Sequence, residues 1–206
     1  MIRLQGLSEK EIETILQRVT DSFYDYAYCQ DDTGLKSFFK SRDDMYTYIS
    51  AIVKASYKSG LLYATSENHE GFMVLSGEGA GSIGFIDGIK MILAEKKALG
   101  GWKKLKEFVS ASFSDGGSIE TRMRKAKRKF LRIEVLVVLK EYQEQGFMRQ
   151  MMEYACQIAD EKKVAVILDT DDRNKALRYQ HLGMNLDRVR NCGEKYHLYD
   201  LIRETA

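Results

Sequence analysis

The feature that most constrains the fold is a succession of strand, loop, helix and strand between residues 130 and 168. Phe130–Leu139 is a nearly continuous run of β-prone residues, which is typical of a central strand covered on both faces. A polar segment that ends in Gly146 follows, and apolar residues then recur at helical spacing from Phe147 to Ala159. Val164–Leu168 reads as a second buried strand. Two strands joined through a helix predict a partly parallel sheet with helices packed against it.

The remaining elements complete a mixed α/β pattern around this unit. Ser8 and Glu11 have the spacing of a capping box, so the first helix is expected to begin there. The other elements follow from turn residues and from helical or strand periodicity. The expected set is a helix near 8–20, a helix after Ser41 that ends at Gly60, a hairpin from Leu61–Thr65 and Phe72–Leu75, a short helix at Arg173–Leu182, and a closing hairpin from runs near Met184–Arg190 and Tyr196–Ile202 joined by a turn at 191–194.

Residues 77–129 are expected to form a helical elaboration inserted before the central strand. Their apolar residues indicate two helices separated by a break at Gly100-Gly101. Neither helix buries its apolar face alone, so the segment is expected to pack onto the rest of the chain. We therefore predict a single α/β domain over residues 1–206.

Composition argues against several classes of partner and site. A formal net charge of +2 is too small to indicate a nucleic-acid or membrane partner for the whole chain. The basic run Arg122–Arg132 could contact the phosphates of a nucleic acid or the ribose phosphate of a cofactor, but it is interpreted as a solvated face. Cys29, Cys156 and Cys192 are widely spaced and no CxxC or zinc-ligand spacing occurs, so we expect free thiols and no metal. The expected localisation is cytoplasmic, because no signal peptide or membrane-spanning run is visible.

An acidic segment and an aromatic segment leave alternatives open. Asp169-Thr-Asp171-Asp172 lacks the glycine and closing glutamate of a calcium loop, so Asp171 or Asp172 is expected to cap the next helix. The aromatic-rich stretch from Phe23 to Tyr28, with Phe38 and Phe39, is either ordinary packing or the wall of a pocket for an apolar or cationic amine.

Two motifs carry a resemblance to a known family. Gln143-Glu-Gln-Gly146-Phe-Met148 is similar to the Q/R-x-x-G-x-G/A loop of the GNAT superfamily of N-acetyltransferases, and it follows a strand of the right character. Asn174 and Tyr179-x-x-x-Gly183-Met184 resemble the second signature of that family. The chain departs from the family at Lys140, Met148 and Met184, where proline, glycine or alanine, and phenylalanine are usual.

The resemblance implies acetyl-CoA as cosubstrate and assigns its contacts. The backbone of the central strand is expected to pair with the pantetheine arm, and the N–H groups of the loop and helix start are expected to hold the pyrophosphate. The implied cofactor-binding residues are Leu136, Val137, Val138, Gln143, Glu144, Gln145, Gly146, Phe147, Met148, Arg149 and Asn174.

The resemblance also implies direct acyl transfer, which needs a proton acceptor for the amine and a proton donor for the departing thiolate. Tyr179 is the expected donor. The alternative is that its side chain is half-buried and only packs against its neighbours. Glu134 and Asp169 compete as the base, and a salt bridge, for Glu134 with Arg132 or Lys129, is the alternative for each. By strand alternation Glu134 is predicted to project to the same face as Leu136 and Val138.

The function that follows is an N-acetyltransferase that acts on the primary amine of a small molecule. Acetylation of a peptide or protein amine is the alternative within enzymes. A non-catalytic module that senses acyl-CoA is the alternative outside them, and Met148 is the residue that favours it. The sequence leaves the acceptor, the acyl chain length and the oligomeric state open, with a homodimer among the options.

Overall fold

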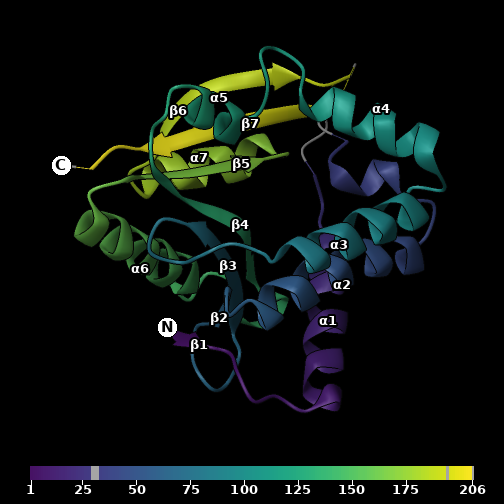
Figure 1. The fold of residues 1–206 in the computed structure, drawn as a ribbon. Coiled ribbons are helices and arrows are strands. Elements are labelled where there is room, and N and C mark those ends of the chain that lie inside the picture. Colours follow the sequence, from purple (N-terminus) through teal and green to yellow (C-terminus); the bar gives the residue numbers. More distant parts are fainter. Residues whose placement is uncertain (29–32, 194, 206) are drawn as a thin grey trace.

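The computed structural model describes residues 1–28, 33–193 and 195–205, so Cys29 and position 194 of the predicted turn lie outside the described residues. A mixed sheet runs through the middle of the molecule (Figure 1), and its described strands follow the order β1-β2-β3-β4-β5-β7-β6. β4 and β5 pair in parallel, and the other neighbours are antiparallel. The strands are β1 (Ile2–Arg3), β2 (Leu62–Ala64), β3 (Gly71–Gly77), β4 (Phe130–Val138), β5 (Ala165–Thr170), β6 (Asn185–Asn191) and β7 (His197–Arg203). This arrangement confirms the predicted fold class.

Helices cover both faces of the sheet. α1 and α2 pack against Val135 and Val137 of β4, whereas α6 and α7 pack against Leu131 and Ile133 on the opposite face. The helices are α1 (Glu9–Tyr24), α2 (Arg42–Lys58), α3 (Phe85–Ala98), α4 (Trp102–Ser112), α5 (Ile119–Lys125), α6 (Phe147–Lys162) and α7 (Arg173–His181), with short 3₁₀ turns at Leu35–Phe38 and Lys140–Tyr142.

The predicted helix starts are confirmed by their hydrogen bonds. Ser8 accepts from the Glu11 N–H, and the Glu11 carboxylate accepts from the Ser8 N–H at 2.8 Å, which completes the capping box. Ser41 caps α2. Of the two candidates before α7, Asp172 is the cap, because its carboxylate accepts from the Lys175 N–H at 2.9 Å.

Residues 77–129 form three helices among the described residues, one more than predicted. The break at Gly100-Gly101 lies between α3 and α4 as expected. The additional helix, α5, occupies the first part of the basic run. Ser118 caps it, and Ile119 and Met123 bury their side chains against β5, so short-range capping and tertiary packing outweigh the polar character of the segment.

A bulge in β4 overturns the predicted direction of Glu134. Val74 of β3 pairs with Val135, but the next β3 residue, Leu75, pairs with Ile133, so Glu134 is the extra residue. The bulge interrupts strand alternation. Leu136 and Val138 pack with the α6 cluster, whereas Glu134 accepts a hydrogen bond from Ser76 on the α1–α2 face. The predicted common face of Glu134, Leu136 and Val138 is therefore wrong.

Candidate functional site

The site begins where β4 and β5 part. Their parallel pairing extends only from Phe130–Arg132 of β4 to Ala165–Ile167 of β5. Beyond Arg132, β4 continues to Val138 along β3, while β5 continues to Thr170 along β7. The β4 backbone from Leu136 to Val138 therefore has no strand on its β5 side, and such an edge can pair with an extended ligand.

A cavity of about 410 Å³ lies at this divergence. It brings together the end of β4, the loop after it, the start of α6, the end of α1 and one side of α7. Its lining comprises Ser22, Phe23, Tyr26, Leu136, Val137, Val138, Tyr142, Gln143, Glu144, Gly146, Phe147, Met148, Lys175, Arg178 and Tyr179.

The start of α6 forms one end of the cavity and has the character of an anion site. Gly146 precedes the helix with a left-handed φ of 86°, a conformation that explains the glycine. Among the described residues no side chain caps this end, and the first turn carries no acidic residue. The N–H groups of Phe147, Met148 and Arg149 are those that an α-helix leaves without internal partners, so they suit a phosphate group.

Met148 does not obstruct the cavity. Its side chain is half-buried, packs against the α6–α7 cluster and forms part of the cavity wall. The N–H groups at the start of α6 belong to the main chain. A bulky side chain at position 148 therefore does not remove them as donors.

Tyr179 lies on α7 and forms part of the wall of the same cavity. The residue is 6% exposed, and burial, followed by the negative charge of Asp171, raises the pKa of its phenol. A raised pKa keeps the phenol protonated at neutral pH, which is the state that donates a hydrogen bond or a proton.

Lys175 is one helical turn before Tyr179 and reaches the same cavity. Its ammonium lies 3.6 Å from the ring centroid of Tyr26, with Phe23 and Tyr28 at 5.9 and 5.6 Å, and 4.0 Å from Asp171 Oδ1. Three of the aromatic residues that were predicted either to pack or to wall an acceptor pocket, Phe23, Tyr26 and Tyr28, therefore surround a lysine of the chain itself.

Gly34 keeps one of these rings in place. Its φ is 59°, and a Cβ there would lie 1.9 Å from Tyr28 Cε1. The ring thus packs directly on the Gly34 backbone. From this position, the Tyr28 hydroxyl donates to Asp171 Oδ2 at 2.9 Å.

The two candidate bases lie together beside Arg132, outside the cavity lining. Arg132 Nη2 donates to Asp169 Oδ1 at 3.0 Å, and its Nε is 3.0 Å from Glu134 Oε2 without the alignment of a hydrogen bond. The Glu134 side chain keeps 29% exposure, and the Asp169 side chain keeps 20%. Burial alone would lower the pKa of Arg132, but its three neighbouring carboxylates outweigh burial and raise it.

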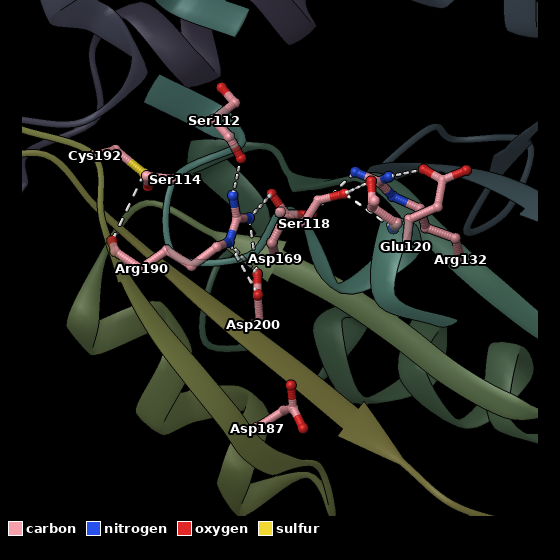
Figure 2. A network of polar contacts seen from close by, with 12 residues as sticks. Ser112, Ser114, Ser118, Glu120, Arg132, Asp169, Asp187, Arg190, Cys192 and Asp200 are labelled. Atoms are coloured by element: carbon pink, nitrogen blue, oxygen red, sulfur yellow. Dashed lines mark hydrogen bonds and ion pairs between the residues drawn. The ribbon is translucent and has the colours of Figure 1, made fainter. Parts of the chain in front are cut away.

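Asp169 also joins a buried network that connects α4, α5 and the last two strands (Figure 2). Arg190, 1% exposed, makes a bidentate pair with the fully buried Asp200 and lies 3.7 Å from Asp169 Oδ2. Arg190 also donates to the Ser112 carbonyl at the end of α4. The network fixes Asp169 from the side opposite Arg132.

The structure gathers most, but not all, of the predicted site residues. Leu136–Val138, Gln143, Glu144, Gly146–Met148 and Tyr179 line one cavity, whereas the other predicted residues do not line it. Those others are Glu134, Gln145, Arg149, Asp169 and Asn174. The sequence analysis did not identify Lys175 and Arg178, which also line the cavity. For Lys175, the spacing of four residues before Tyr179 on a predicted helix was a usable signal.

Other kinds of site are absent from the described residues. None of the helices in residues 1–28, 33–193 and 195–205 is long and apolar enough to cross a membrane. Over the same ranges, no cluster of three or more His, Cys, Asp or Glu side chains could hold a metal ion.

Solved structures share this fold at low sequence identity. Drosophila melanogaster polyamine N-acetyltransferase is 14% identical, with 97% of this chain and 98% of that chain covered and a TM-score of 0.57. The NatC complex bound to Gag peptide and CoA is 12% identical, with coverages of 100% and 97% and a TM-score of 0.51. Nourseothricin acetyltransferase matches only in part, at 16% identity and a TM-score of 0.34, and the matched segment covers 37% of this chain and 51% of that chain. No curated protein shows a significant sequence match.

Family membership follows from the sequence itself. The model of the acetyltransferase (GNAT) family matches residues 36–184, which is more than half of the chain and includes β4, the loop, α6 and α7. This chain therefore belongs to the GNAT family of acetyltransferases, enzymes that take their acetyl group from acetyl-CoA.

Proposed function

We propose that this chain transfers the acetyl group of acetyl-CoA to the primary amine of a small molecule. The observation that carries the proposal is the cavity at the β4–β5 divergence, which combines a free strand edge, an uncapped helix start and a buried phenol. An extended thioester with an anionic end fits this combination, because each part of the ligand meets a group of matching chemistry.

Each part of the cavity has one task in this proposal. The backbone of Leu136–Val138 pairs with the amides of the pantetheine arm. The N–H groups at the start of α6 hold the pyrophosphate, and Arg178, which also lines the cavity, adds a positive charge. Gln143 and Glu144 form the loop wall. Gln145, Arg149 and Asn174, which do not line the cavity, are proposed as further contacts of the cofactor.

Tyr179 acts as proton donor to the departing thiolate. Its raised pKa keeps the proton on the phenol until charge develops on the sulfur. Glu134 is the proposed base. Its carboxylate lies at the β4 bulge beside the divergence and is more exposed than that of Asp169, so a water molecule can connect it to the amine.

The size of the cavity favours a small acceptor. The same 410 Å³ must accommodate the thioester arm, so little volume is left beside Phe23 and Tyr26. The polyamine N-acetyltransferase of Drosophila melanogaster, which has this fold, is consistent with an acceptor of this size.

Binding and turnover test the proposal in sequence. We expect calorimetric titration with acetyl-CoA and with free CoA to give micromolar dissociation constants. A panel of small amines and short peptides, followed by thiol release, should then give turnover with at least one small amine. Absence of binding to both ligands would refute the proposal. Turnover with peptides alone would show that the acceptor is a peptide amine and not a small molecule.

The two candidate bases can be separated by matched amide variants. We expect Glu134→Gln to lower kcat about tenfold or more, and Asp169→Asn to lower it less, because Asp169 is held between Arg132 and Arg190. Steady-state kinetics against the best amine measures both. A larger loss for Asp169→Asn would move the role of base to Asp169.

A further inference from the structure

The ammonium of Lys175 lies in an aromatic cage that opens into the proposed active-site cavity. Tyr26 provides the closest ring, 3.6 Å from Nζ to the centroid, and the rings of Phe23 and Tyr28 stand farther away. Asp171 closes the cage with a carboxylate oxygen 4.0 Å from Nζ. The cage resembles the surroundings that a protein builds for a cationic amine.

Lys175 and Tyr179 line the same cavity. They are four residues apart on α7, so their side chains lie on one helix face in successive turns. Both line the cavity together with Leu136–Val138, the strand edge proposed for the pantetheine arm. A primary amine of the chain is thus located where the acceptor of the reaction is expected.

We propose that Lys175 is itself an acetyl acceptor, so that the chain acetylates its own α7 when acetyl-CoA is bound. This inference rests on the proposed function, because the thioester must occupy the same cavity. The position of the lysine beside the thioester replaces a bimolecular encounter, which is a large advantage over lysines on the outer surface.

The step balances without a further reagent. The ammonium first loses one proton to solvent, with Asp171 as the nearest carboxylate. The neutral nitrogen attacks the thioester carbonyl, a C–N bond forms, and the C–S bond breaks. The second proton of the amine ends on the departing thiolate through the Tyr179 phenol, which leaves acetyl-lysine and CoA.

The environment of Lys175 helps the first of these events. Burial lowers the pKa of its ammonium, although the charges of Asp171 and Asp172 oppose that shift. A lower pKa raises the fraction of neutral, nucleophilic amine at a given pH.

Site-resolved mass spectrometry tests the proposal on the full chain. The purified protein is incubated with trideuteroacetyl-CoA, without amine, and digested at intervals, so that new label is distinguished from acetylation during expression. We expect Lys175 to be labelled at least about tenfold faster than the exposed Lys90 and Lys129. The faster labelling of Lys175 should disappear in Tyr179→Phe and in the urea-unfolded chain, while Lys90 and Lys129 are labelled at the same rate as before.

The controls separate this idea from the proposed function. Lys175→Arg keeps the positive charge and should remove the fast label while acetyl-CoA still binds in calorimetry. Labelling of Lys175 no faster than of Lys129, in a preparation that binds acetyl-CoA and turns over an amine, would refute self-acetylation alone. Absence of acetyl-CoA binding would refute both proposals.

Discussion

Replacement of Tyr179 by phenylalanine is expected to lower kcat about 100-fold, with little change in the dissociation constant of acetyl-CoA. The variant removes the proton donor and keeps the ring that fills the buried site between α7 and the sheet. The departing thiolate would then have to take its proton from water. Steady-state kinetics and calorimetry on the same preparation give the two quantities.

Tyr154→Phe is the matched control for this variant. Tyr154 lies on α6, and its ring packs near that of Tyr63, outside the cavity lining. The control should retain wild-type kcat. If Tyr179→Phe also retains it, Tyr179 is a packing residue and another group protonates the thiolate.

Asp200→Ala is expected to lower the free energy of unfolding by about 3–5 kcal/mol, because it leaves a buried guanidinium without its main partner. Asp200 is fully buried, and its two oxygens accept from Arg190 Nε and Nη2 at 2.8–3.1 Å. Asp169, at 3.7 Å, is a remote substitute. Urea unfolding followed by circular dichroism measures the change.

The exposed pair between Asp160 and Arg203 provides the comparison. It has the same bidentate geometry, with distances of 2.8 and 2.9 Å, but Asp160 keeps 45% side-chain exposure. Water screens such a pair, so Asp160→Ala should cost less than about 1 kcal/mol. Equal losses of unfolding free energy in the two variants would show that burial does not determine how much the network contributes to stability.

The buried network also explains why the elaboration before β4 matters to the site. Ser112 at the end of α4 accepts from Arg190, and Glu120 of α5 pairs with Arg132, so both arginines that hold Asp169 are themselves anchored by residues 77–129. Figure 2 shows these contacts meeting at Asp169. Residues 77–129 therefore help to fix the position of Asp169, one of the two candidate bases.

Local patterns in the sequence were sufficient for most of the elements and for the residues that we propose as the cofactor side of the site. The apolar run of β4, the glycine before α6 and the capping serines specify structure through neighbours a few residues away. The strand edge, the loop and Tyr179 then meet in one cavity because a parallel strand–helix–strand unit leaves little freedom in how they are arranged.

Only the tertiary structure decided how the residues of the proposed acceptor side are arranged. The direction of Glu134 depends on the bulge opposite β3, and a bulge is a property of two paired strands that the residues of β4 alone do not encode. The cage of Lys175 joins α7 to aromatic residues about 150 positions earlier in the chain, and the bidentate pair of Arg190 and Asp200 forms across two strands. Such contacts arise from how separate elements pack, so periodicity and spacing within one element do not determine them.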